Sequence, residues 1–441
     1  TNVLNVAEGD NTVTLTNGQN TVNAGSGADS ITASGGTNVL NVGEGSNLVA
    51  LTNGQNTVTA GSGADQITAS GGTNVLNVAE GDNTVTLTNG QSTVNAGSGA
   101  DSITASGGTN VLNVGEGSNV VALTDGQNTV TAGSGADQIT ASGGTNVLTV
   151  AEGDNTVTLT DGQNTVTAGS GADQITVNSG VNVIDVGDGS NVVALSDGQN
   201  TVTAGSGADQ ITASGGTNVL SVAEGDNTVA LTDGQNTVTA GSGADSITAS
   251  SGVNVIDVGD GSNVVTLTDG QNTVTAGSGP DQITASGGTN VLTVAEGDNT
   301  VTLTDGQNTV TAGSGADQIT ASGGTNVLNV GDGSNVVALT DGQNTVTAGS
   351  GADQITASGG TNVLSVAEGD NTVTLTDGQN TVTAGSGADQ ITASGGTNVL
   401  TVAEGDNTVA LTVGQNTVTA GSGADQITAS GGTNVLNVGD G

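Results

Sequence analysis

The sequence predicts an all-β fold, a parallel β-solenoid of two facing sheets with 18 residues in each coil. The first observation is that a 36-residue stretch beginning at Thr1 recurs at Thr37, Thr73 and Thr109 and onward to Thr433. The second is that each stretch divides into four nonapeptides. The third is composition, since 441 residues include 77 Gly but no aromatic residue, Cys or Met. Burial must therefore come from thin layers of small aliphatic side chains repeated along an axis.

Each nonapeptide predicts one tight turn followed by one short strand. Each nonapeptide has three fixed positions, which hold first Gly, then Asn or Asp, and then Val, Leu or Ile. A period of nine with a glycine turn and an alternating apolar tripeptide suits strands of three to five residues and no helix. The columns of the first repeat are Gly9, Gly18, Gly27 and Gly36 for glycine, and Leu4, Val13, Val22 and Ile31 for the aliphatic residue.

The coil length follows from the core. A coil of 27 residues would not divide the 36-residue repeat, and a coil of 36 would enclose a lumen that Val, Leu and Ala are too small to fill. Coils of 18 residues, about 24 in number, bring the two sheets close enough for these side chains to meet. This arrangement predicts that Leu4 stacks on Val22 and that Asn11 and Asn47 flank Asp29.

Charge and composition exclude several classes of function. The formal charge of −42, with no Lys, Arg or His, excludes electrostatic binding to nucleic acid and anionic lipid and makes metal cations the natural counter-ions. No apolar run reaches the ~20 residues of a membrane span. Without His, Lys, Cys or Tyr, no ordinary base can activate a hydroxyl, so we expect no enzymatic activity.

One nonapeptide in four resembles a known family. The phrase AGSGADSIT at residues 24–32, and its later copies AGSGADQIT, are similar to the calcium-binding RTX nonapeptide GGxGxDxUx except at the first glycine. The other three nonapeptides keep the glycine and the aliphatic residue but place Asn where the family has Asp. The resemblance implies a calcium-dependent β-roll and secretion and, in large members, a role as a spacer or adhesin.

The turns fall on two edges, and one of them is acidic. The acidic edge alternates VAEGDN or VGEGSN with AGSGAD, whereas the neutral edge alternates ASGGTN with LTNGQN, later LTDGQN. Carboxylate, amide and carbonyl oxygens are the ligands that Ca²⁺ prefers, so we expect calcium between adjacent turns of the acidic edge. The candidate ligands are Asp29, Asp65, Asp101, Asp137, Asp173, Asp209, Asp245, Asp281, Asp317, Asp353, Asp389, Asp425, Glu8, Asp10, Glu44, Asn11 and Asn47.

Three alternatives stay open. The Asn column could form a metal-free ladder of amides, with the acids merely solvated. Outward threonines such as Thr12 and Thr14 resemble the ice-binding faces of antifreeze proteins, although Thr is also a good strand former. The outward valines Val3, Val39 and Val75 form a stripe that could pack copies side by side, although scattered exposed Val is normal.

The interpretation that combines these observations is a structural rod. We expect a single continuous repeat array over residues 1–441 that belongs to a longer chain. Its expected location is extracellular or at the cell surface, where it would serve as an extender, an adhesin stalk or a filament subunit stabilised by calcium. Ice binding is the alternative function.

Overall fold

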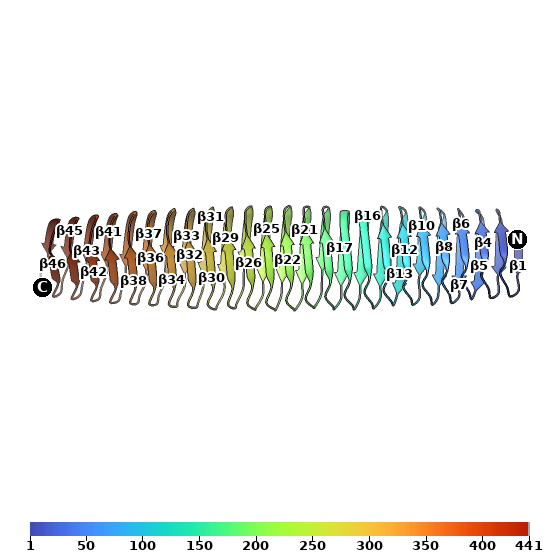
Figure 1. Ribbon diagram of the computed structural model, residues 1–441, viewed down its shortest axis with the longest axis horizontal. Coiled ribbons are helices and arrows are strands. Elements are labelled where there is room, and N and C mark those ends of the chain that lie inside the picture. The colour runs from blue at the N-terminus through green and yellow to red at the C-terminus, as the bar shows by residue number, and fades with distance from the viewer. Residues whose placement is uncertain (440–441) are drawn as a thin grey trace. The chain divides into compact units, whose positions relative to one another are not determined.

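A computed structural model describes residues 1–439, and these residues form a parallel β-solenoid with 18 residues in each coil. The chain winds alternately through two sheets (Figure 1). Within each part of the solenoid, successive coils pair their strands in parallel, as in Asn2 with Asn20 and Leu4 with Val22. The predicted fold class and coil length are confirmed. No helix long and apolar enough to cross a membrane occurs among the described residues.

The coils group into two compact units, Thr1–Ala223 and Glu224–Gly441. In the first unit, sheet 1 contains β1 (Asn2–Asn5), β3 (Gln19–Asn23), β5 (Thr37–Gly43), β7 (Gln55–Ala60), β9 (Thr73–Val78), β11 (Gln91–Asn95), β13 (Thr109–Gly115), β15 (Gln127–Ala132), β19 (Val181–Asp185), β21 (Gln199–Ala204) and β23 (Thr217–Val222). Sheet 2 contains β2 (Thr12–Leu15), β4 (Ser30–Ala33), β6 (Leu48–Leu51), β8 (Gln66–Ala69), β10 (Thr84–Leu87), β12 (Ser102–Ala105), β14 (Val120–Leu123), β18 (Gln174–Val177), β20 (Val192–Leu195) and β22 (Gln210–Ala213).

The second unit repeats this arrangement. Its sheet 1 contains β25 (Gln235–Ala240), β27 (Val253–Asp257), β29 (Gln271–Ala276), β31 (Thr289–Val294), β33 (Gln307–Ala312), β35 (Thr325–Asn329), β37 (Gln343–Ala348), β39 (Thr361–Val366), β41 (Gln379–Ala384), β43 (Thr397–Val402), β45 (Gln415–Ala420) and β47 (Thr433–Val438). Its sheet 2 contains β24 (Thr228–Leu231), β26 (Ser246–Ala249), β28 (Val264–Leu267), β30 (Gln282–Ala285), β32 (Thr300–Leu303), β34 (Gln318–Ala321), β36 (Val336–Leu339), β38 (Gln354–Ala357), β40 (Thr372–Leu375), β42 (Gln390–Ala393), β44 (Thr408–Leu411) and β46 (Gln426–Ala429).

The expected strand length of three to five residues is exceeded by many sheet 1 strands, such as β5 with seven residues and β7 with six, and two strands are much longer still. β16 (Gln138–Val150) and β17 (Thr156–Ala168) each have 13 residues and contribute to both sheets. Their pairing continues around the turn, where Ser142 pairs with Asp161 between two shifts of register. Tight turns on the neutral edge thus let one strand run from sheet 2 into sheet 1.

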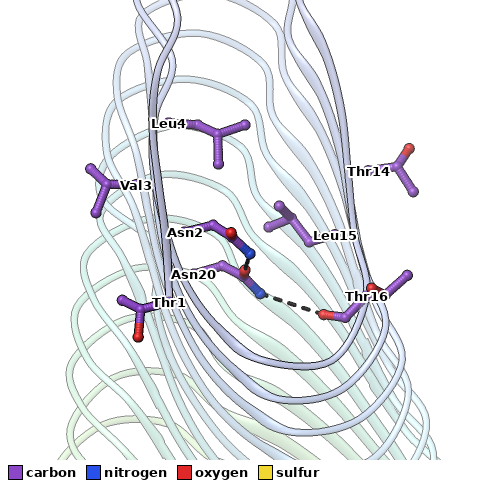
Figure 2. Close-up of a pocket in the computed structure, with 8 residues that line it drawn as sticks. All are labelled: Thr1, Asn2, Val3, Leu4, Thr14, Leu15, Thr16 and Asn20. Carbon is purple, nitrogen blue, oxygen red and sulfur yellow. Dashed lines mark hydrogen bonds between the residues drawn. The ribbon is translucent and has the colours of Figure 1, made fainter.

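The core lies between the two sheets and is made of thin aliphatic layers. Leu4 and Leu15 point toward one another from opposite sheets, whereas Val3 and Thr14 point outward (Figure 2). These residues line an open pocket of about 500 Å³ at the first coil. From the second coil onward the inward positions are closed, since Val22, Ile31 and Ala33 are all 0% exposed, and they open again only in the last coil, where Leu436 is 43% exposed. Alternation with period two therefore sorts the side chains into core and surface.

Glycine is required where the turns of successive coils stack closely. Gly135 has a φ of +137°, which other residues rarely adopt, and a Cβ there would collide with the carbonyl oxygen of Gly117 one coil away. The same positive φ recurs in the equivalent turns of both units. The nonapeptide glycine thus permits both the turn and the close stacking of coils.

Candidate metal centre

The acidic edge comprises the turns that lead from sheet 1 into sheet 2, and it contains a column of polar residues with little or no exposure. The column begins Asn11, Asp29, Asn47 and Asp65, with each residue one coil after the last. Each one directly precedes a strand of sheet 2, so its side chain is fixed between the turn and that strand. Asp29, Asn47 and Asp65 are at most 1% exposed. The prediction that Asn11 and Asn47 flank Asp29 is confirmed.

Hydrogen bonds link the column in one direction along the coils. Asp29 accepts two bonds at Oδ1, from the backbone N–H of Asn11 at 2.9 Å and from its Nδ2 at 2.8 Å. The backbone N–H of Asp29 donates to Oδ1 of Asn47 at 3.0 Å. Asn47 then donates in the same way to Asp65. Every Oδ1 in this series is therefore an acceptor of bonds from the preceding coil.

The second carboxylate oxygen of these aspartates is shielded from water and receives no hydrogen bond. A carboxylate oxygen without a donor is costly in a desolvated position. Within the described residues this condition holds for Oδ2 of Asp29, Asp65, Asp101, Asp137, Asp173, Asp245, Asp281, Asp317, Asp353, Asp389 and Asp425. The acidic edge thus contains a regular row of negatively charged atoms that the protein itself does not neutralise.

Burial is reflected in the acidity of these groups. Desolvation raises the pKa of Asp101 above its ordinary value, and it outweighs the two bonds from Asn83, which lower the pKa. The charge of Asp82 raises it further. The pKa is raised by the same leading cause at Asp65, Asp137, Asp173, Asp209, Asp245, Asp281, Asp317, Asp353 and Asp389. A nearby cation would relieve this desolvation penalty.

The remaining predicted ligands lie on the outer side of the same turns. Glu8, Asp10 and Glu44 are exposed. Asp10 accepts a bond from the backbone N–H of Ala28 at 2.8 Å, which ties one turn to the next. Among residues 1–439 no three acidic side chains come together as a group that could hold a metal ion. A site on this edge would therefore consist of one buried carboxylate supplemented by neutral oxygens.

The neutral edge contains a second buried ladder of Asn side chains, in addition to the Asn column of the acidic edge for which a ladder was expected. Nδ2 of Asn20 donates to Oδ1 of Asn38 at 2.8 Å, and Asn38 donates to Asn56 at 2.7 Å. Figure 2 shows the first step, from Asn2 to Asn20, and the bond from Asn20 to the carbonyl oxygen of Thr16. The recurrence of Asn every 18 residues from Asn2 is the sequence signal for this ladder. Because the column contains no carboxylate, its side chains bond to one another without a cation, except that Oδ1 of Asn110, next to Ser92, has no partner.

A family model matches almost the whole chain. The model of the RTX calcium-binding nonapeptide repeat (4 copies) matches residues 14–49, 52–85, 88–121, 124–157, 159–193, 196–229, 232–265, 267–301, 303–337, 340–373, 374–409 and 412–441. The chain belongs to the RTX calcium-binding repeat family. The matched residues include the nonapeptides in which Asn replaces Asp. The family model therefore covers far more of the chain than the one nonapeptide in four that resembles the consensus.

Family membership implies Ca²⁺ binding by this RTX chain, and RTX repeats are typical of secreted proteins. No curated protein and no solved structure matches the chain. The residues on the acidic edge fit calcium, since the buried Oδ2 atoms lack a hydrogen-bond partner and the adjacent turns contain amide and backbone carbonyl oxygens. Calcium takes six to eight such hard ligands in flexible geometry.

Proposed function

We propose that this chain is a calcium-stabilised structural segment of a secreted or cell-surface protein, serving as an extender, an adhesin stalk or a filament subunit. The observation that carries the proposal is the row of buried Oδ2 atoms without a donor on the acidic edge. A structural role agrees with the repetition of the same turn in every second coil, because a catalytic site is normally unique. We therefore propose no enzymatic activity.

The aspartates from Asp29 to Asp425 would hold the ions, helped by turn carbonyls and by the Asn side-chain oxygen of the next coil. Bound calcium supplies the positive charge that these buried carboxylates lack. Asn47 would contribute Oδ1 to the ion at Asp29, whereas Asn11 anchors the other carboxylate oxygen. The exposed Glu8, Asp10 and Glu44 would attract cations to the edge without touching them.

Lateral association of copies is part of the proposal. The charges gather on the turns, and the described strands contain only three charged residues, Asp185 and Asp257 on sheet 1 and Asp161 where β17 passes around the neutral edge. On sheet 1 the valine stripe remains exposed, with Val39 at 47% and Val111 at 47%. A face with exposed valines and few charges would allow two copies to pack without bringing their acidic edges together.

Ice binding is not supported by the arrangement of threonines. On sheet 2 the row through Thr12 and Thr14 meets Leu48 and Ala50 two coils later. This interruption recurs at Val120 and later coils. An ice-binding face requires a regular array, so we propose the structural role in its place.

The proposed calcium role is tested by chelation of the whole chain at low ionic strength. We expect β content, measured by far-UV circular dichroism, to fall in excess EDTA and to return with calcium. Magnesium is the control for the ion, because it demands a smaller octahedral site and dehydrates reluctantly. Sodium chloride at ~0.15 M is the control for screening, since it shortens the Debye length to about 8 Å without filling a site. Unchanged β content in EDTA, or full recovery with sodium chloride alone, would contradict the proposal.

A further inference from the structure

The Asn side chains on the acidic edge bond both to the turn carbonyls of their own coil and to the aspartate of the next coil. Nδ2 of Asn83 donates to Oδ1 of Asp101 at 2.9 Å and to the turn carbonyls of Gly81 at 2.8 Å and Ala79 at 3.4 Å. Asn47 repeats the pattern with Asp65, Gly45 and Gly43. One amide nitrogen thus collects three oxygens from two adjacent coils, as a small cation would.

The aspartate turns have the same shape but opposite chemistry. Both side chains use Oδ1 to accept the bond from the preceding coil, so Oδ2 of Asp101 is the counterpart of Nδ2 of Asn83. By this equivalence the counterparts of the three acceptors around Nδ2 of Asn83 are the carbonyl oxygens of Gly97 and Gly99 and Oδ1 of Asn119, which accepts the backbone N–H of Asp101 at 3.0 Å. Every group in this set is an acceptor. An aspartate turn therefore lacks the donor that an asparagine turn contains.

We propose that the Asn amide replaces the calcium ion at every second turn of the acidic edge, so that this chain binds one ion per 36 residues, at the aspartate turns only. The inference rests on the proposed calcium role and specifies its stoichiometry. The asparagine turns are permanently filled by a covalently attached hydrogen-bond donor. The neutral edge binds no ion, because its buried column contains Asn and Ser but no Asp within the described residues.

Alternation also reduces the mutual repulsion of the ions. Adjacent coils lie ~4.8 Å apart, so ions in every second turn are separated by roughly twice that distance. Their Coulomb repulsion is then about half of what ions in adjacent turns would experience. Half of the turns also keep their hydrogen bonds when calcium is removed. We therefore expect chelation to loosen the acidic edge at alternate turns and to leave the neutral-edge ladder intact.

The test is a count of calcium bound per chain, by equilibrium dialysis of the full chain followed by elemental analysis. The sequence has twelve aspartates in the column, so saturation near twelve is expected, against about twice that number if the asparagine turns also bind. Replacing Asp65, Asp101, Asp137 and Asp173 by Asn should remove four ions. Far-UV circular dichroism should show that this variant stays folded and keeps more β structure in EDTA than the parent chain.

A matched control removes the same charge elsewhere. Asp125, Asp161, Asp197 and Asp233 are exposed on the neutral edge, and their replacement by Asn should leave the count unchanged. In the opposite direction, Asn119→Asp should add one ion. A count near 24 calcium ions per chain would overturn the stoichiometry while leaving the calcium role in place. So would an unchanged count in the variant with all four acidic-edge aspartates replaced by Asn. No bound calcium at all, with β content indifferent to EDTA, would instead contradict the proposed function itself.

Discussion

Repair of the one break in the neutral-edge ladder should stabilise the coils around it. Ser92 occupies a position that is otherwise Asn in this column throughout the described residues. Asn74 reaches its Oγ only at 3.3 Å, and Oδ1 of Asn110 is buried without a hydrogen-bond partner. Ser92→Asn would place an amide between these two side chains. The substitution should therefore add one hydrogen bond and shorten another.

The expected gain in stability is the difference between two free energies, the cost of the unsatisfied acceptor that is removed and the cost of ordering the longer side chain. An unsatisfied buried acceptor costs about 1–3 kcal/mol, and ordering the longer side chain costs up to about 1 kcal/mol. We expect a net gain of about 1–2 kcal/mol in local stability. Since 1.4 kcal/mol corresponds to a factor of ten, amide exchange in the coils around Ser92 should slow by about five- to thirtyfold.

Hydrogen exchange with peptic fragments and mass spectrometry is the suitable assay, because repeat arrays need not unfold as one cooperative unit. The matched control is Asn128→Ser, which removes the amide that donates to Oδ1 of Asn146. This acceptor should then be buried without a partner, and amide exchange in its coil should become faster by a similar factor. If neither substitution alters exchange in its own coils, the amide ladder contributes nothing measurable and the reasoning is wrong.

Three further outcomes are expected. Gly135→Ala should destabilise its coil by more than ~1 kcal/mol, measured by hydrogen exchange, because a Cβ there meets the carbonyl oxygen of Gly117 at a φ of +137°. The metal-free chain should have a higher Tm at pH ~4 than at pH 7, because burial raises the pKa of groups such as Asp101 in the folded state. Between the ordinary pKa and the raised pKa the folded state binds more protons than the unfolded state, so its stability falls as the pH rises. A Tm that increases with pH over this range would contradict the prediction. Thermal hysteresis should be negligible at micromolar protein, and clear hysteresis would revive ice binding through the threonine rows.

The fold was predictable because the repeat period of the sequence determines it. A repeat of 36 residues with four aliphatic positions leaves few ways to build a filled core, and the stacking of Leu4 on Val22 follows from the 18-residue choice. The lengths of β16 and β17 were not predictable, because pairing across the turn at Ser142 depends on backbone geometry rather than residue type. The single-array organisation of residues 1–441 stays a prediction.

The candidate site was predictable only in part. Spacing alone placed Asp29 between Asn11 and Asn47. It could not show which atoms meet, and the difference between an anchored Oδ1 and a partnerless Oδ2 decides where a cation is needed. The ladder on the neutral edge had a clear signal in the recurrence of Asn.

The buried polar columns of the two edges meet their hydrogen-bonding requirements by different means. On the neutral edge each Asn amide both donates and accepts along the column, so the series is complete wherever Asn continues, and Ser92 marks where it fails. On the acidic edge every second member is a carboxylate, which accepts but cannot donate from its side chain, so aspartates such as Asp101 interrupt the series at Oδ2. Under the proposed calcium role, a cation would repair that interruption, and an Asn in its place would repair it permanently. Retaining Asp in alternate coils would then make the acidic edge dependent on calcium, whereas the amide ladder of the neutral edge needs no ion.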